Sequence, residues 1–100
     1  MTVPRINIPQ PELADLCRRH KIRRLALFGS VLRDGFGPTS DVDVLVTFQP
    51  DARLGFMELG RIRRELSALL RRPVDLVPED ALKPLIRDEV LSTAEEIYAA

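Results

Sequence analysis

The sequence has little of the residues from which thiol chemistry and histidine chemistry are usually built. It contains one cysteine, Cys17, and one histidine, His20, among its 100 residues. A single cysteine cannot close an internal disulfide or supply a cysteine-based zinc site. A single histidine argues against a Cys/His metal site and against a histidine-dependent catalytic triad. We therefore expect a protein of the reducing cytoplasm whose chemistry relies on other side chains.

Net charge and long apolar runs are also lacking. Fifteen Lys and Arg residues balance fifteen Asp and Glu residues, so the overall charge gives no reason to expect direct nucleic-acid binding. The basic segments 18–24 and 61–72 predict solvated helix faces, with a phosphate or partner surface as the alternative. No uncharged run is long enough to span a bilayer, and no apolar signal-peptide core follows the N-terminus. We expect neither a membrane span nor secretion.

Length and composition predict one small globular domain over residues 1–100, with residues 1–10 as an extended lead-in. Hydrophobic residues make up 45% of the chain and charged residues 30%, which is ordinary globular usage. A chain of this length can bury enough surface for one modest core.

Hydrophobic periodicity predicts an α/β domain with a small mixed sheet of about three strands packed with helices. We expect helices over residues 11–20, 54–70 and 84–91, and strands over residues 24–28, 41–48 and 74–77. Glycines and a proline in residues 34–40 predict a loop. Ser92 and Glu95 have capping-box spacing, which predicts that a last short helix begins there and includes Tyr98.

Gly29 and Ser30 follow the first expected strand and form a candidate phosphate-binding turn. A glycine lets backbone N–H groups approach a ligand closely. If Ser30 opens a short helix through Arg33, these N–H groups and the helix dipole suit a phosphate, and the serine hydroxyl can donate to the same oxygens. A Gly-Ser dipeptide alone is weak evidence for such a site and by itself favours a plain tight turn.

Three aspartates on expected strands form the second candidate group. Asp41 and Asp43 would point to one face of their strand, and the valines beside them to the other. Neighbouring carboxylates repel unless a cation lies between them, and Mg²⁺ with oxygen ligands fills that role. Asp75 lies in an otherwise apolar strand, where a charge is costly unless it is paired or bound to metal. If the two strands pair, three carboxylates converge; the alternatives are solvent-facing edge-strand aspartates and a salt bridge of Asp75.

The order Gly29-Ser30, residues 31–40, Asp41-x-Asp43 and a later strand aspartate, Asp75, resembles the signature of the DNA polymerase β-type nucleotidyltransferase superfamily. The short length of the chain and its segment FGSVLRDGFGPTSDVDVLV resemble those of the minimal nucleotidyltransferases (MNT) of this superfamily. These are commonly encoded beside a HEPN-domain partner as toxin–antitoxin pairs. The resemblance covers roughly residues 12–98 and implies the minimal polymerase β-like fold.

The resemblance also implies roles for the residues of the glycine–serine turn and the loop after it. Gly29 and Ser30 match the residues that hold the nucleotide triphosphate. Arg33 matches a basic residue that contacts phosphate or supports the turn, and Ser40 matches a polar residue that caps or orients the turn before the first aspartate.

The carboxylates match the metal-binding residues of the resembled family. Asp41 and Asp43 correspond to the two metal-binding aspartates, and Asp75 to a third carboxylate that helps bind metal and deprotonates the acceptor hydroxyl. Two departures are visible. Asp34 stands before Gly35, where a glycine often follows the arginine directly. Arg71 and Arg72 stand where a glycine often ends the helix before the third strand.

The implied activity is Mg-dependent transfer of AMP from ATP, with two Mg²⁺ ions, to a tyrosine hydroxyl of a HEPN ribonuclease toxin. The chain would then act as an antitoxin in a hetero-oligomer with that toxin. Two alternatives stay open: an antitoxin that neutralises its partner by binding alone, and a nucleotidyltransferase subunit acting on a small molecule or an RNA end.

Overall fold

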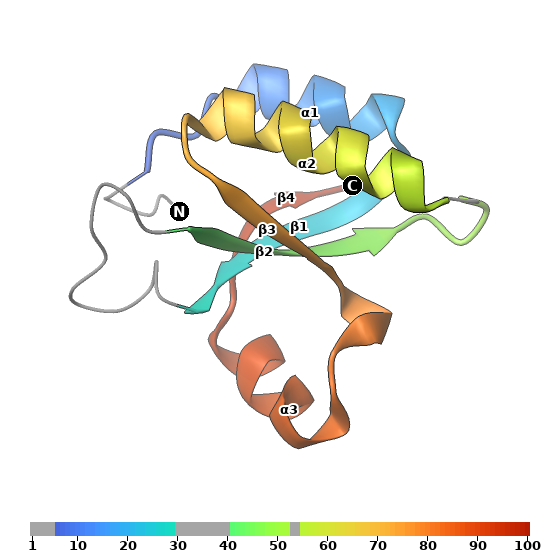
Figure 1. Ribbon diagram of the computed structural model, residues 1–100, viewed down its shortest axis with the longest axis vertical. Coiled ribbons are helices and arrows are strands. Elements are labelled where there is room, and N and C mark those ends of the chain that lie inside the picture. The colour runs from blue at the N-terminus through green and yellow to red at the C-terminus, as the bar shows by residue number, and fades with distance from the viewer. Residues whose placement is uncertain (1–5, 30–40, 53–54) are drawn as a thin grey trace.

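A computed structural model describes residues 6–29, 41–52 and 55–100 of the chain (Figure 1). The elements in chain order are α1 (Gln10–Arg19), β1 (Ile22–Phe28), β2 (Val42–Phe48), α2 (Phe56–Leu70), β3 (Val74–Pro78), the short 3₁₀ helix η2 (Glu79–Ala81), α3 (Pro84–Thr93) and β4 (Glu95–Ala99). Within the described ranges, no helix combines the length and apolarity needed to cross a bilayer.

The four strands form one mixed sheet in the order β3-β2-β1-β4. Strand β1 pairs antiparallel with both β2 and β4, whereas β2 and β3 run parallel. A parallel pair needs a crossover connection, which α2 supplies here. Helices α1 and α2 lie on one side of the sheet and α3 on the other (Figure 1). The predicted α/β class is confirmed, with one strand more than expected.

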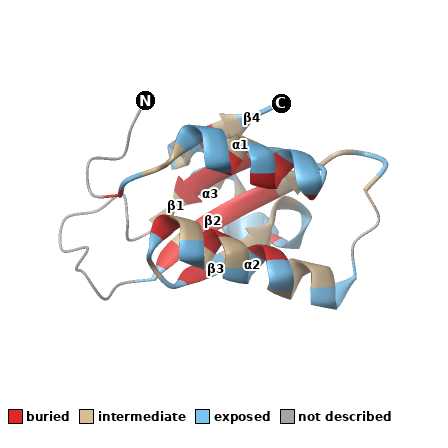
Figure 2. Cartoon of the chain, turned by 90° about the horizontal axis from the view of Figure 1, so that it is seen from above, coloured by how far each residue is buried: buried red, intermediate tan, exposed pale blue. Residues whose placement is uncertain are grey.

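Alternation along the strands divides the core between the two faces of the sheet. Val42, Val44 and Val46 of β2 belong to the larger cluster, with buried residues of α1 and α2. Leu45 points the other way, into a smaller cluster with Ala26 and Leu82, against which side chains of α3 pack. The view from above in Figure 2 shows the buried sides of α1 and α2 turned towards the strands.

The expected last helix was wrong, because residues Glu95–Ala99 form β4. In this segment Ile97 is buried while its neighbours are not, which is the period of a strand with one covered face. The hydroxyl of Ser92 donates to the Glu89 carbonyl oxygen at 3.0 Å, within the last turn of α3. Ser92 therefore lies in the last turn of one helix instead of beginning another, and Tyr98 pairs with Leu25 across the sheet.

A buried histidine joins the first two helices. His20, at the C-terminal end of α1, is 8% exposed, and its two ring nitrogens lie 3.1 Å from Glu58 Oε2 and 2.9 Å from Glu65 Oε2, both on α2. Arg19 also donates to Glu65 Oε1 at 3.0 Å. Partial burial acts to raise the pKa of Glu65, but the hydrogen bonds from His20 and Arg19 outweigh it and hold the pKa below its ordinary value.

We predict that Glu65→Gln lowers the free energy of unfolding by about 1 kcal/mol at pH 7. This is below the range of about 1.5–3 kcal/mol for hydrogen bonds to a charged group, because Glu65 is partly exposed. The pKa of Glu65 is lower in the folded protein than its ordinary value of 4.5. The ionised carboxylate therefore contributes fully to the free energy of unfolding above pH 4.5, and this contribution is lost as the pH falls through the pKa of the folded protein. Urea titrations at several pH values should show that the difference in the free energy of unfolding between the variant and wild type disappears at acid pH. Glu89→Gln, at an exposed position of α3, should show no such gap; an equal loss there would contradict the prediction.

We also predict that the thiol of Cys17 is unreactive in the folded protein. Cys17 is fully buried on the inner side of α1, and burial raises the pKa of its thiol to about 12. Because the thiolate is the reactive form, a disulfide reagent at pH 8 should label Cys17 only after urea unfolds the chain. Rapid stoichiometric labelling without urea would show that the helix opens readily.

Candidate active site

The parallel pairing of β2 with β3 brings two of the predicted aspartates side by side. Asp43 stands opposite Asp75 in the register, one pair after Val42 and Val74. Neighbouring strands lie about 4.8 Å apart, so the two side chains leave the sheet next to each other on the same face. Asp43 is half-buried and Asp75 is exposed. The sequence had predicted this juxtaposition only on the condition that the two strands pair.

Asp41 lies one residue before β2 begins and is exposed. The N–H of Val42 donates to the carbonyl oxygen of Pro73 at 2.8 Å, so the chain next to Asp41 is tied to the residues that lead into β3. In the described residues, however, no three His, Cys, Asp or Glu side chains already form a group able to hold a metal ion. The predicted convergence of all three carboxylates therefore stays a prediction.

The end of β1 is shaped to accept the Asp43 side chain. Gly29 follows Phe28, which is the β1 neighbour of Asp43, and has a φ of +76°, a conformation that favours glycine. A Cβ at this position would overlap the carboxylate of Asp43. The glycine is thus needed both for its backbone conformation and for space. Its predicted companions Ser30, Arg33 and Ser40 lie outside the described residues.

Phe28 is a neighbour of the carboxylates that the sequence analysis did not single out. It belongs with the smaller cluster on the α3 side of the sheet and is half-buried. The register places Phe28, Asp43 and Asp75 in one row across three strands. The only sequence signal for this role is that Phe28 is the last residue before the glycine turn.

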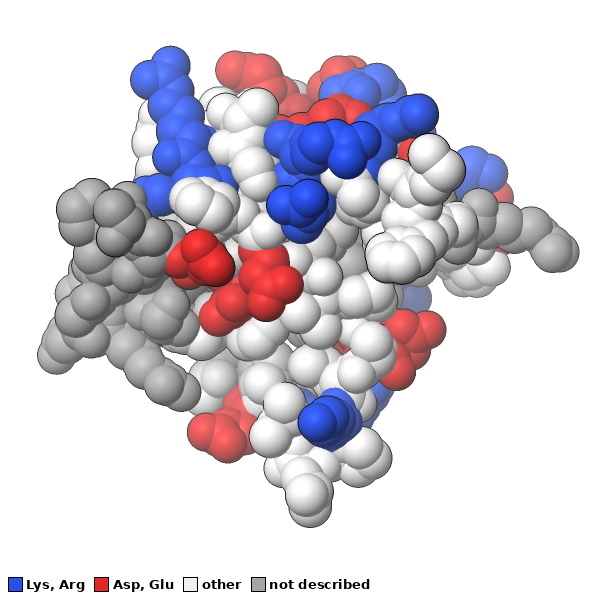
Figure 3. All heavy atoms as spheres, viewed as in Figure 1, with Lys and Arg blue, Asp and Glu red and all other residues white. Residues whose placement is uncertain are grey.

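The donors at this end of the sheet suit Mg²⁺ in chemical type. Mg²⁺ prefers hard oxygen ligands and is usually held by one or two carboxylates together with the phosphates of a substrate. The in-register pair of Asp43 and Asp75 provides two such carboxylates, and the exposure of Asp75 leaves its side open to a ligand. Figure 3 shows acidic side chains gathered on the left of the molecule, with basic side chains above them.

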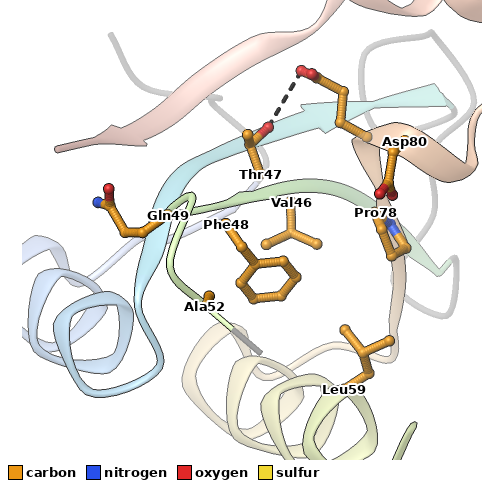
Figure 4. A pocket seen from close by; sticks show the side chains of 9 residues that line it. Val46, Thr47, Phe48, Gln49, Ala52, Leu59, Pro78 and Asp80 are labelled. Atoms are coloured by element: carbon orange, nitrogen blue, oxygen red, sulfur yellow. Dashed lines mark hydrogen bonds between the residues drawn. The ribbon is translucent and has the colours of Figure 1, made fainter. Parts of the chain in front are cut away.

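A separate pocket of about 410 Å³ lies at the other end of β2 (Figure 4). Phe48, Leu59 and Pro78 face one another across it, and the hydroxyl of Thr47 donates to Glu79 Oε1 at 3.3 Å. Three to five residues of extended strand, about 10–16 Å, separate its β2 residues from Asp43. This pocket is therefore distinct from the carboxylate pair.

Comparison with known families agrees with this arrangement. The sequence matches the family described as "Nucleotidyltransferase domain" over residues 13–97. The chain belongs to the nucleotidyltransferase family. The resemblance inferred from the glycine–serine turn and the aspartates is thereby confirmed, and the protein is a nucleotidyltransferase with an α/β fold.

Curated relatives within this family carry protein adenylyltransferase names. The Thermococcus cleftensis protein "Protein adenylyltransferase MntA" is 40% identical over 78 residues, covering 77% of this chain and 76% of the relative. The Methanocaldococcus jannaschii protein "Putative protein adenylyltransferase MJ0435" is 30% identical over 92 residues, covering 92% of this chain and 97% of the relative.

Solved structures share the fold of this nucleotidyltransferase. A structure described as a "putative minimal nucleotidyltransferase" has a TM-score of 0.69 and 35% identity, covering 89% of this chain and 87% of that one. A toxin–antitoxin complex with AMP-PNP contains a chain with a TM-score of 0.71 and 20% identity, covering 93% of this chain and 75% of that one. At this lower identity the likeness establishes the shared fold.

We predict that Gly29→Ala damages both the fold and the site. The positive φ and the overlap with Asp43 should lower the free energy of unfolding by about 1–3 kcal/mol and displace the carboxylate. Urea unfolding and calorimetric titration with Mg-ATP would measure the two effects.

Gly60→Ala is the matched control. Gly60 lies within α2, and a Cβ there would meet only the end of the Arg64 side chain at 3.5 Å. Alanine at this site should stabilise the helix by about 0.5–1 kcal/mol and leave nucleotide binding unchanged. If Gly29→Ala had the stability and the Mg-ATP affinity of the wild type, Gly29 would not be part of the site.

Proposed function

We propose that this nucleotidyltransferase transfers AMP from ATP to a tyrosine hydroxyl of a HEPN-domain ribonuclease toxin and so acts as its antitoxin. The observation that carries the proposal is the register of Asp43 with Asp75, next to a glycine that leaves room for the carboxylate. Relatives named protein adenylyltransferase support AMP as the transferred group. Chains of the same fold occur in toxin–antitoxin complexes, one of which holds a tri-AMPylated HEPN toxin from Shewanella oneidensis.

In the proposed reaction the tyrosine oxygen forms a bond to the α-phosphorus of ATP. The bond between this phosphorus and the oxygen that bridges to the β-phosphorus breaks, and pyrophosphate leaves with its electron pair. The hydroxyl proton passes to the carboxylate of Asp75 and from there to water. Because Asp75 is exposed at the edge strand of the sheet, both an acceptor on another protein and the solvent can reach it.

The other residues of the proposed site orient the nucleotide. Asp41, Asp43 and Asp75 would hold two Mg²⁺ ions, whose chemistry is to neutralise the triphosphate and the departing pyrophosphate and to acidify the acceptor hydroxyl. Asp43 is positioned by β2 and by the space at Gly29. We assign nucleotide contacts to Ser30, Arg33 and Ser40 by resemblance, and we place the reaction in the cytoplasm.

Modification of a tyrosine near a ribonuclease site explains inactivation in simple terms. The attached AMP adds bulk and a negative phosphate, and both oppose the approach of polyanionic RNA. The same structure also allows an antitoxin that acts by contact alone or a transferase whose acceptor is a small molecule or an RNA end, so the decisive experiment must separate binding from transfer.

We predict that Asp75→Asn binds Mg-ATP and the toxin but does not modify the toxin. Asparagine keeps the shape of the side chain and removes the proton acceptor, and loss of a general base typically slows a reaction by about 10²–10⁴-fold. Calorimetric titration, co-purification with the toxin and mass spectrometry of the toxin would measure the three properties separately.

Asp88→Asn is the matched control for this test, because Asp88 is exposed on α3. This variant should transfer AMP at the wild-type rate. Cells that produce active toxin should be poisoned in the presence of Asp75→Asn. Full protection by this variant without AMP on the toxin would show that neutralisation occurs by contact. Labelling of RNA or a small molecule by the wild-type protein, with the toxin unmodified, would identify another acceptor.

A further inference from the structure

The buried histidine at the end of α1 has a carboxylate at each of its two ring nitrogens. Nδ1 of His20 lies 3.1 Å from Glu58 Oε2, and Nε2 lies 2.9 Å from Glu65 Oε2. Glu58 is in the first turn of α2, which lies beside α1 (Figure 2), and Glu65 follows about two turns later. One ring therefore holds two separate turns of the neighbouring helix. These three residues, the His20 cluster, do not belong to the proposed active site.

The two contacts together require a hydrogen on each ring nitrogen. An ionised carboxylate only accepts hydrogen bonds, and a neutral imidazole carries an N–H on one nitrogen and a lone pair on the other. With a neutral ring, one contact would set a lone pair against a carboxylate oxygen at 2.9 or 3.1 Å. The imidazolium form donates from both nitrogens and satisfies both contacts. The geometry thus fits a cationic ring between two anions.

A protonated glutamate is the other possible source of the second hydrogen, but the surroundings of Glu65 argue against it there. Partial burial acts to raise the pKa of Glu65, yet the hydrogen bonds from His20 and Arg19 hold this pKa below its ordinary value. Arg19 donates to Glu65 Oε1 at 3.0 Å. The guanidinium of Arg61 lies 3.9 Å from Glu58 Oε1. Each carboxylate therefore has a second cation beside it as well as the ring.

The other charged groups near the ring form exposed pairs with one another. On α1, Asp15 accepts a hydrogen bond from Arg19 at 3.1 Å. In the connections that follow α1 and β2, the ammonium of Lys21 lies 3.2 Å from Asp51. Opposite charges cancel in these pairs, so within the described residues the two glutamates are the charges that contact the ring directly.

The His20 cluster is open to solvent on one side although the ring itself is buried. The side chains of Glu58 and Glu65 are 31% and 30% exposed. A cavity of about 480 Å³, lined in part by His20 and Glu58, lies beside the ring. Water can therefore reach the carboxylates, and a change of pH can act on the cluster without unfolding of the protein.

We propose that the imidazolium of His20 is a pH-sensitive clasp that joins α1 to α2 and opens when alkaline pH removes one of its two ring protons. Loss of this proton leaves a lone pair facing a carboxylate, so the ring has to give up one of its two partners. Both partners lie on α2, and the contact between the two helices is weakened as a result.

The clasp fixes the sign of the pH effect. In the folded protein two carboxylates hold the second ring proton, whereas in the unfolded chain no carboxylate is fixed beside the ring. Because the folded state retains the proton more firmly, the free energy of unfolding falls as the pH rises through the range in which the proton leaves. A neutral histidine that only packs and donates one hydrogen bond would give no such fall.

The first test uses the fact that the chain has a single histidine, so that its ring signals are unambiguous. Long-range ¹H–¹⁵N NMR spectra of the folded protein at neutral pH should show both ring nitrogens protonated. The ring should lose one proton at a higher pH in the folded protein than in the urea-unfolded chain. A ring nitrogen without a proton in the folded protein at neutral pH, or the same midpoint in both states, would overturn the proposal.

The second test is urea unfolding of the wild type and His20→Gln between about pH 6 and about pH 9. Glutamine removes the ring proton, and every other titrating group is common to the two proteins. We expect the equilibrium constant of unfolding to rise about 10-fold more in the wild type, as for the loss of one charge-assisted hydrogen bond. Glu58→Gln should abolish most of this difference, because its amide can donate to the Nδ1 lone pair of a neutral ring.

Arg18→Gln is the matched control, because it removes one exposed positive charge from the same helix and should keep the pH dependence of the wild type. If the wild type and His20→Gln depend on pH equally, His20 is no clasp. If Arg18→Gln loses the dependence as well, the effect belongs to the overall charge of α1 and the proposal also fails. Should His20→Gln not fold, Glu58→Gln and the NMR spectra of the wild type still decide between the two roles of His20.

Discussion

The parallel pairing of β3 with β2 is the constraint on which the site depends. It sets Asp43 beside Asp75, and a shift by one residue would turn one of them to the opposite face. Helix α2 makes the pairing possible as the crossover, and Ser67 near its end fixes the turn that leads into β3. The packing of α2 on the sheet through Ile62, Leu66 and Leu70 thus indirectly positions the carboxylates.

The same strand serves the core and the chemistry by alternation. On β2, three valines bury one face beneath α1 and α2, and this burial fixes the direction of Asp43 on the other face. The sheet can hold two neighbouring carboxylates there because its hydrophobic side supplies the stability that their repulsion reduces. Gly29 adds the local condition, since any larger residue at the end of β1 would meet Asp43.

Sequence reasoning identified most of the fold and the chemistry, and its failures have physical reasons. The valine alternation and the Pro73 boundary were sufficient to find β2, α2 and β3. The segment Glu95–Ala99 was mistaken for a helix because five residues with one buried side chain carry little periodicity, and its partner β1 is about 70 residues away in the chain. The left-handed backbone of Arg71 had one signal, its place where a glycine often ends the helix in the resembled family; the arginine itself does not indicate this conformation, because the turn imposes it.

The neighbouring carboxylates limit how this end of the sheet can bind a nucleotide. Asp43 and Asp75 are adjacent, with Asp41 just before β2, so a bare triphosphate would be repelled. Cations must therefore accompany the nucleotide. Asp75 is exposed on the edge strand and can meet them, and the half-buried Asp43 is held beside it by β2 and by the space at Gly29. Carboxylates that are already held in place lose less conformational entropy when the metal and the nucleotide bind.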